Sequence, residues 1–167
     1  MIKRIFSRTY VTLTISATSI RLLSVQGKRV KKWCSMPLEA GWVKDGLITQ
    51  PKAVGAAIST LFRSTKLPKN RVITTVTGLP FTYHVLTLPR MKPSLVDEAI
   101  QRAVRAEMPL PPEEVYLSWQ VIDSRPDELD YFLVGVPRNP VDAVLRTLAE
   151  AGIKPYICLL YTSPSPR

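Results

Sequence analysis

Alternating apolar and polar residues dominate the first forty positions of the chain. Residues 9–16 and 18–26 fit two strands, a Gln-Gly-Lys turn signal follows, and residues 29–36 fit a third strand. The next pattern has helical spacing and predicts a helix over residues 51–64. A run rich in β-branched residues then predicts a buried strand over residues 71–77. The first half therefore combines a small sheet with one amphipathic helix.

The pattern changes after the Thr-Gly-Leu-Pro sequence at residues 77–80. The second half is expected to form a strand, a helix, two strands and a helix, over residues 81–88, 94–108, 116–122, 131–136 and 139–152. These elements predict an α+β fold of two small subdomains, residues 1–78 and an inserted module over residues 79–153. The Ser/Pro-rich end lacks capping and amphipathic patterns, so we expect residues 154–167 to be a truncated or artefactual tail and the natural protein to continue beyond about Ile157.

Charge is distributed unevenly along the chain. The 23 Lys and Arg residues exceed the 13 Asp and Glu residues, and every charged residue before Glu39 is basic. Lys3, Arg4 and Arg8 near the start are candidates for contact with an anionic surface such as acidic lipid. The same pattern fits the solvated face of a hairpin, and both interpretations stay open.

Signals for catalysis and metal binding are absent from the sequence. Cys34 and Cys158 do not form a Cys-x-x-Cys pair, and His84 is the single histidine. None of the motifs His-Glu-x-x-His, Gly-x-Ser-x-Gly, Gly-x-Gly-x-x-Gly or the P-loop occurs. No apolar run approaches the roughly 20 residues of a membrane helix. We therefore expect no enzyme activity and no bound metal. The two lone cysteines indicate a protein of a reducing compartment.

One turn is a candidate phosphate site. The first two strands are joined by small hydroxyl-bearing residues, and a tight turn of this kind either cradles a phosphate or closes a plain hairpin. The candidate residues are Thr14, Ser16, Ala17, Thr18 and Ser19.

Several collinear phrases resemble one family. They are VTLTISATSIRLL, PLEAGWVKDGLITQPKAV, the long stretch from NRVITTVTGLPFTYHVLTLPR to EEVYLSWQVI, and FLVGVPRNPVDAVLRTLAEAGIKP. Together they resemble the type IV pilus assembly protein PilM, an actin-like relative of the cell-division protein FtsA, from about Val11 to Tyr156. The resemblance implies a partial actin-like, ribonuclease H-like sheet (subdomain 1A) over residues 1–78. It implies an inserted strand–helix–strand–strand module (subdomain 1C) over residues 79–153.

The resemblance also bears on nucleotide binding. ATP-binding members of the family carry Asp and Gly where this chain has Thr14 and Ser16. A hydroxyl is a weaker Mg²⁺ ligand than a carboxylate, and a Cβ restricts the approach of backbone to phosphate. We therefore expect no ATP or Mg²⁺ cofactor. An actin-like ATP-binding protein with a degenerate phosphate loop and an FtsA-like division protein are the alternatives.

The partners implied by the resemblance are other pilus platform proteins. PilM-like proteins are cytoplasmic scaffolds, peripheral at the inner membrane, that bind the short N-terminal tail of the membrane protein PilN in a groove between the two subdomains. Nucleic acid is not an expected partner, although the basic charge keeps a nucleic-acid-binding domain as a rival interpretation. We expect a non-catalytic interaction module.

Overall fold

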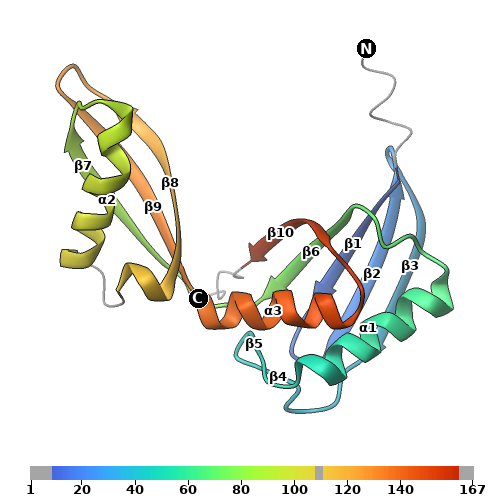
Figure 1. Ribbon diagram of the computed structural model, residues 1–167. Helices are drawn as coiled ribbons and strands as arrows, with labels where there is room; N and C mark the ends of the chain where they lie inside the picture. Colours follow the sequence, from blue (N-terminus) through green and yellow to red (C-terminus); the bar gives the residue numbers. More distant parts are fainter. Residues whose placement is uncertain (1–8, 108–110, 162–167) are drawn as a thin grey trace, which may run out of the picture. The chain divides into compact units, whose positions relative to one another are not determined.

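The chain folds into two compact units, one of residues up to Leu79 together with those from Asp142 onward, and one of Pro80–Val141. The computed structural model describes residues 9–107 and 111–161. The first unit is built on a five-stranded sheet with the order β10-β6-β1-β2-β3 (Figure 1). Its strands are β1 (Thr9–Ile15), β2 (Ser19–Gln26), β3 (Arg29–Pro37), β6 (Val72–Thr77) and β10 (Pro155–Tyr161).

The direction of the strands makes this sheet mixed. β1 pairs antiparallel with β2, which pairs antiparallel with β3, whereas β6 runs parallel to both β1 and β10. The parallel pairing of β1 and β6 requires a crossover, and α1 (Pro51–Thr65) supplies it. A short hairpin of two strands, each of two residues, precedes that helix: β4 (Val43–Lys44) and β5 (Leu47–Ile48).

One face of the sheet forms the core of the first unit. Val11, Leu13 and Ile15 of β1 are fully buried, while the residues between them are only half-buried, as the period-2 pattern predicts. The buried face packs against α1 and α3 (Arg138–Glu150). The helices contribute Val54, Ile58, Leu61, Phe62, Ala143, Val144 and Leu148 to this core.

The second unit is a three-stranded antiparallel sheet with one helix packed on it. Its order is β7-β9-β8, from β7 (Thr82–Pro89), β9 (Glu128–Pro137) and β8 (Val115–Ser124). The helix α2 (Pro93–Glu107) covers one face (Figure 1), and a short 3-10 helix, η2 (Pro112–Glu114), leads into β8. The core consists of Leu86, Ile100, Val104, Tyr131 and Leu133.

The structure confirms the mixed α+β class, but its units differ from the predicted subdomains after the first boundary. The inserted unit ends at Val141 and not after residue 153, because the apolar side chains of α3 pack in the core of the first unit. The predicted tail over residues 154–167 also needs correction. Residues 155–161 form β10, because their apolar and aromatic side chains favour a strand. The backbone N–H and C=O groups of β10 pair with those of β6.

Smaller differences concern helix starts and faces. α2 begins at Pro93, one residue before the predicted start of that helix, so Ser94 lies inside its first turn. α3 begins at Arg138, directly after β9, and not at Asn139. Leu95 of α2 and Leu145 of α3 continue the apolar spacing of their helices, yet both side chains are exposed. Helical periodicity predicts the centre of the apolar face, but it does not decide whether residues at the sides of that face are buried.

Candidate functional site

The turn between β1 and β2 is closed by its own hydrogen bonds. The backbone N–H of Ser16 donates to the Ser19 carbonyl at 3.0 Å, and the Ser16 hydroxyl donates to the same carbonyl at 2.9 Å. The Ser19 N–H in turn donates to the Ser16 hydroxyl at 3.2 Å. The two hydroxyls lie 3.1 Å apart. Both serine side chains are therefore engaged within the turn.

The other candidate residues of this turn are placed apart from one another. Thr14 lies in β1, paired with Arg21 of β2 and Thr75 of β6. Ala17 and Thr18 are exposed at the turn, and the Thr18 carbonyl accepts a hydrogen bond from the Leu38 N–H at 2.9 Å. Among the described residues, positive φ outside glycine occurs at Asp45, Lys66 and Arg71 and not in this turn. The local geometry is that of a plain hairpin, and it does not require glycine.

The predicted anionic-surface residues Lys3, Arg4 and Arg8 lie outside the described residues. That prediction stays a prediction.

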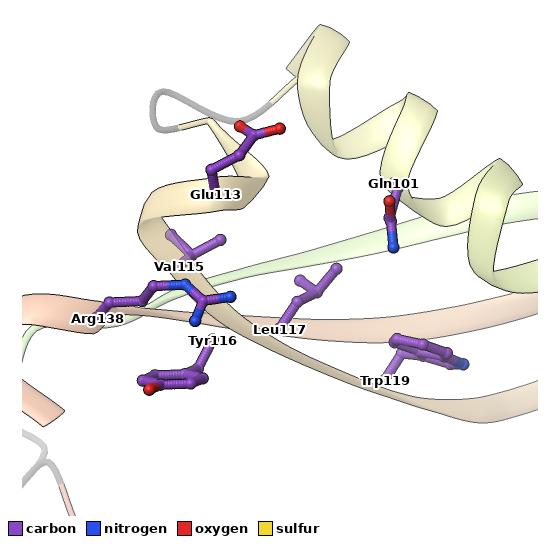
Figure 2. A pocket seen from close by; sticks show the side chains of 7 residues that line it. All are labelled: Gln101, Glu113, Val115, Tyr116, Leu117, Trp119 and Arg138. Atoms are coloured by element: carbon purple, nitrogen blue, oxygen red, sulfur yellow. The ribbon is translucent and has the colours of Figure 1, made fainter. Parts of the chain in front are cut away.

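The second unit contains a shallow pocket beside the strand β8. Its volume is about 370 Å³, enough for one or two large side chains. The lining comes from α2, η2, β8 and the first residue of α3, namely Gln101, Glu113, Val115, Tyr116, Leu117, Trp119 and Arg138. In Figure 2, Leu117 and Trp119 lie below Gln101 of α2, and Arg138 lies near the far end. The pocket thus combines an apolar floor with a cationic end.

Two arginines set the charge around this pocket. The Arg138 guanidinium lies 4.5 Å from the centre of the Tyr116 ring, a cation–π contact that fixes its position (Figure 2). Arg105 forms an ion pair with the lining residue Glu113 at 3.0 Å. Because Glu113 is paired with Arg105, Arg138 is the cation that can meet a ligand's carboxylate or carbonyl oxygen.

The pocket adjoins an open sheet edge. Within the described part of the second unit, β8 pairs with β9 on one side only. Its residues from Ser118 to Ser124 are all exposed. An exposed edge strand presents unpaired N–H and C=O groups in a row, which an extended peptide can satisfy. An edge strand next to an aromatic pocket is the geometry of peptide binding by strand addition.

The thiols offer little reactivity. Burial raises the pKa of the Cys158 thiol, and burial is also the main cause that raises the pKa of Cys34. Thiolates carry the nucleophilic chemistry of cysteine, so both shifts reduce it near neutral pH. Within residues 9–107 and 111–161, no group of His, Cys, Asp and Glu side chains could hold a metal ion. No helix in that part of the chain is long and apolar enough to span a membrane.

Comparison with protein families decides the affiliation of the chain. The family model described as type IV pilus assembly protein PilM matches residues 12–160. The chain belongs to the PilM family. The match covers both units, and it confirms the resemblance carried by the sequence phrases. A comparison with curated proteins gave no match.

Solved structures extend the comparison to the fold. The structure described as the PilM-PilN type IV pilus biogenesis complex matches with a TM-score of 0.76 and 22% identity, over 90% of this chain and 47% of that chain. The cytoplasmic domain of EpsL, an inner membrane component of the type II secretion system of Vibrio cholerae, matches with a TM-score of 0.59 and 17% identity. That match covers 92% of this chain and 57% of EpsL. This PilM-family chain therefore spans about half the length of the solved structures it matches.

A third solved structure, a Bacteroides thetaiotaomicron protein described as having an actin-like ATPase fold, matches with a TM-score of 0.40 and 7% identity, over 97% of this chain and 55% of that chain. A TM-score at this level does not decide the fold.

Sequence reasoning missed the pocket beside β8. The sequence predicts Tyr116 and Trp119 in a strand and leaves Arg138 between a strand and a helix, without any sign that the three share a surface. The sequence did carry one signal. The predicted strand has aromatic and apolar residues where an exposed strand usually has polar ones. That signal identifies an unusual strand, but it does not reveal which helix residues face it.

Proposed function

We propose that this chain is the partner-binding part of a type IV pilus assembly scaffold that captures the N-terminal tail of a PilN-like membrane protein. The observation that carries the proposal is the PilM family match over residues 12–160. Two further observations support it. The same fold occurs in a structure described as a PilM-PilN complex, and in the cytoplasmic domain of an inner membrane secretion component. The scaffold would work at the cytoplasmic face of the inner membrane alongside other platform proteins.

The pocket beside β8 is our proposed contact for an extended segment of such a tail. The free edge of β8 offers backbone hydrogen bonds, and the pocket offers Trp119 and Leu117 to one large apolar side chain. Arg138 adds a cation that would orient a carbonyl or carboxylate of the peptide. Backbone pairing supplies affinity in this mode, and the pocket supplies specificity.

Calorimetric titration tests this proposal. The ligand is a synthetic peptide copying the N-terminal tail of a PilN protein, with a scrambled peptide as control. We expect binding of the native peptide only. Trp119→Ala should weaken it about tenfold, the loss expected when a buried aromatic anchor is removed. Val121→Ala is the matched control, because Val121 is an exposed residue of the same strand outside the pocket.

The outcomes of this titration separate two conclusions. Equal binding by the native and scrambled peptides, or no binding at all, would overturn tail capture by this chain. Unchanged binding by the Trp119→Ala variant would leave tail capture standing and remove only the pocket as its contact.

In this proposal the chain carries out no nucleotide chemistry. Support comes from the turn after β1, where Ser16 and Ser19 hydrogen-bond to each other and Thr14 replaces the carboxylate of ATP-binding relatives. We expect Mg²⁺-ATP to leave the melting temperature of the purified chain unchanged. A saturable upward shift that requires Mg²⁺ would favour the alternative of a degenerate actin-like ATP-binding protein instead.

A further inference from the structure

The excess of positive over negative charge lies in one of the two units of the chain. The first unit contains 17 of the 23 Lys and Arg residues but only 4 of the 13 Asp and Glu residues. The second unit holds the remaining 6 basic and 9 acidic residues, so it is slightly acidic. A net charge of +10 therefore understates the field around the first unit.

Strand direction gathers many of these basic residues at one end of the first unit. β1, β6 and β10 run parallel, so their first residues lie together. The β2–β3 turn lies at the same end, because Gln26 pairs with Thr9 at the start of β1. We call this the basic end, and its residues are Lys28, Arg29, Lys31, Lys66, Lys69, Arg71 and Lys154.

The acidic residues Glu39 and Asp45 lie at the opposite end of the sheet. Glu39 follows Leu38, whose N–H donates to Thr18 in the turn between β1 and β2. Asp45 lies close to Gly78, just past the last residue of β6. Lys44 and Lys52 also lie near that end, so its basic and acidic residues balance, and the unbalanced positive charge lies at the basic end.

The hairpin of β2 and β3 adds exposed apolar side chains beside these charges. Trp33 is 73% exposed and Val30 is 59% exposed, both on the edge strand β3. Their register partners on β2 are Leu23 and Val25, so the four side chains share one face of the hairpin. Lys32 points to the other face, where its Nζ donates to the Thr65 carbonyl at the end of α1 at 2.8 Å.

Edge protection explains only part of this arrangement. Lysines on an edge strand prevent strands of different molecules from pairing, and that accounts for Lys31. It does not account for a tryptophan with almost three quarters of its surface in water next to an exposed valine. Exposed Trp among Lys and Arg side chains is typical of proteins that lie at a membrane interface, where the ring reaches the head-group region and the cations meet anionic lipid.

We propose that the β2–β3 hairpin docks on the surface of an anionic phospholipid bilayer. The cationic side chains of Lys28, Arg29 and Lys31 meet the lipid phosphates, and Val30 and Trp33 enter the interfacial layer. Nucleic acid shares the phosphate chemistry, but an aliphatic side chain such as Val30 gains nothing against a phosphate backbone. This site does not depend on the capture of a PilN-like tail.

Vesicle co-sedimentation of the full 167-residue chain tests the proposal. Vesicles of phosphatidylcholine with one quarter phosphatidylglycerol are compared with pure phosphatidylcholine at 50 and 200 mM salt. We expect binding to the anionic vesicles only, and weaker binding at the higher salt. Tryptophan emission should shift to the blue on binding, and this shift should be absent in Trp33→Phe.

Paired charge reversals locate the site. Lys28→Glu with Lys31→Glu should lower the partition coefficient at least tenfold, since each basic residue near the surface contributes several-fold. The matched control is Lys44→Glu with Lys52→Glu, which makes the same change of net charge at exposed positions near the opposite end of the sheet. Circular dichroism and melting temperature confirm that both variants fold.

Four results would overturn the proposal. These are equal binding to neutral vesicles, no sedimentation with anionic vesicles, an equal loss in both paired variants, and an emission shift that persists in Trp33→Phe. A DNA duplex that displaces the vesicles, and that loses affinity through the same two lysines, would assign the surface to nucleic acid instead.

Discussion

Gly55 of α1 lies against Thr147 of α3, and a Cβ placed at Gly55 would come within 2.9 Å of the Thr147 carbonyl oxygen. The same Cβ would lie 2.6 Å from the Cβ of Glu150. Both neighbours are backbone or backbone-proximal atoms of a helix, so neither can move aside cheaply. The absence of a side chain at Gly55 allows the two helices to share one face of the sheet.

Gly55→Ala should therefore destabilise the first unit. Alanine ordinarily stabilises a helix interior by about 0.5–1 kcal/mol relative to glycine. Here overpacking should outweigh this gain and give a net loss of about 1–3 kcal/mol, measured as the urea midpoint by circular dichroism. Thr60→Ala on the exposed side of the same helix is the control and should be neutral or slightly stabilising. A Gly55→Ala variant that is more stable than the parent chain would contradict this, because it would mean that α1 and α3 can move apart to admit the methyl group without a loss of stability.

Replacement of Thr74 with valine should raise the stability of the first unit. It is fully buried in β6, and its hydroxyl has no hydrogen-bond partner among the described residues. Thr74→Val keeps the shape and removes an unsatisfied polar atom, so we expect a gain of about 1 kcal/mol in unfolding free energy. Thr147→Val is the matched control, because that equally buried hydroxyl donates to the Ala143 carbonyl at 2.7 Å. The control should gain nothing, and equal responses of the two variants would contradict the assignment.

Lys69 should stabilise the end of α3. Its Nζ donates to the Ala151 carbonyl at 2.6 Å, just after the helix ends, where a cation also interacts favourably with the helix dipole. Lys69→Met keeps most of the side-chain stem and should cost about 0.5–1 kcal/mol in thermal or urea denaturation. Lys52→Met, at an exposed position in the first turn of α1, should cost nothing. Equal losses in both variants would point to a general charge effect.

Asp130 should make the second unit sensitive to acid. The Thr87 hydroxyl donates to its carboxylate at 2.8 Å and Arg125 pairs with it, and together they hold the pKa of Asp130 below its ordinary value of 3.8. A lowered folded-state pKa adds stability above the unfolded-state pKa, and this stability disappears as the pH falls through the folded-state pKa.

Urea midpoints at pH 7 and pH 3 test this relationship. Asp130→Asn should be less stable than the parent chain at pH 7, and the difference should shrink toward pH 3. Asp127→Asn, at an exposed neighbouring carboxylate, should follow the parent chain at both values. A difference for Asp130→Asn that is independent of pH would mean that the side chain acts through packing and not through its charge.

The sequence by itself determined which faces of the elements are buried and which residue types occupy the turn after β1. Alternation of apolar residues fixed the buried side of β1, helical spacing fixed α1, and Thr14 and Ser16 marked the absence of a magnesium-binding carboxylate and of glycine. These features are local, because the period of the backbone decides which side chains share a face.

Only the tertiary structure decided which faces meet. It assigned α3 to the first unit, paired β10 with β6, brought Gly55 against Thr147, and placed Arg138 beside the aromatic residues of β8. It also gathered basic residues from separate turns at one end of the sheet. Contacts of this kind join residues far apart in sequence, and packing and strand order, which no local pattern encodes, select them.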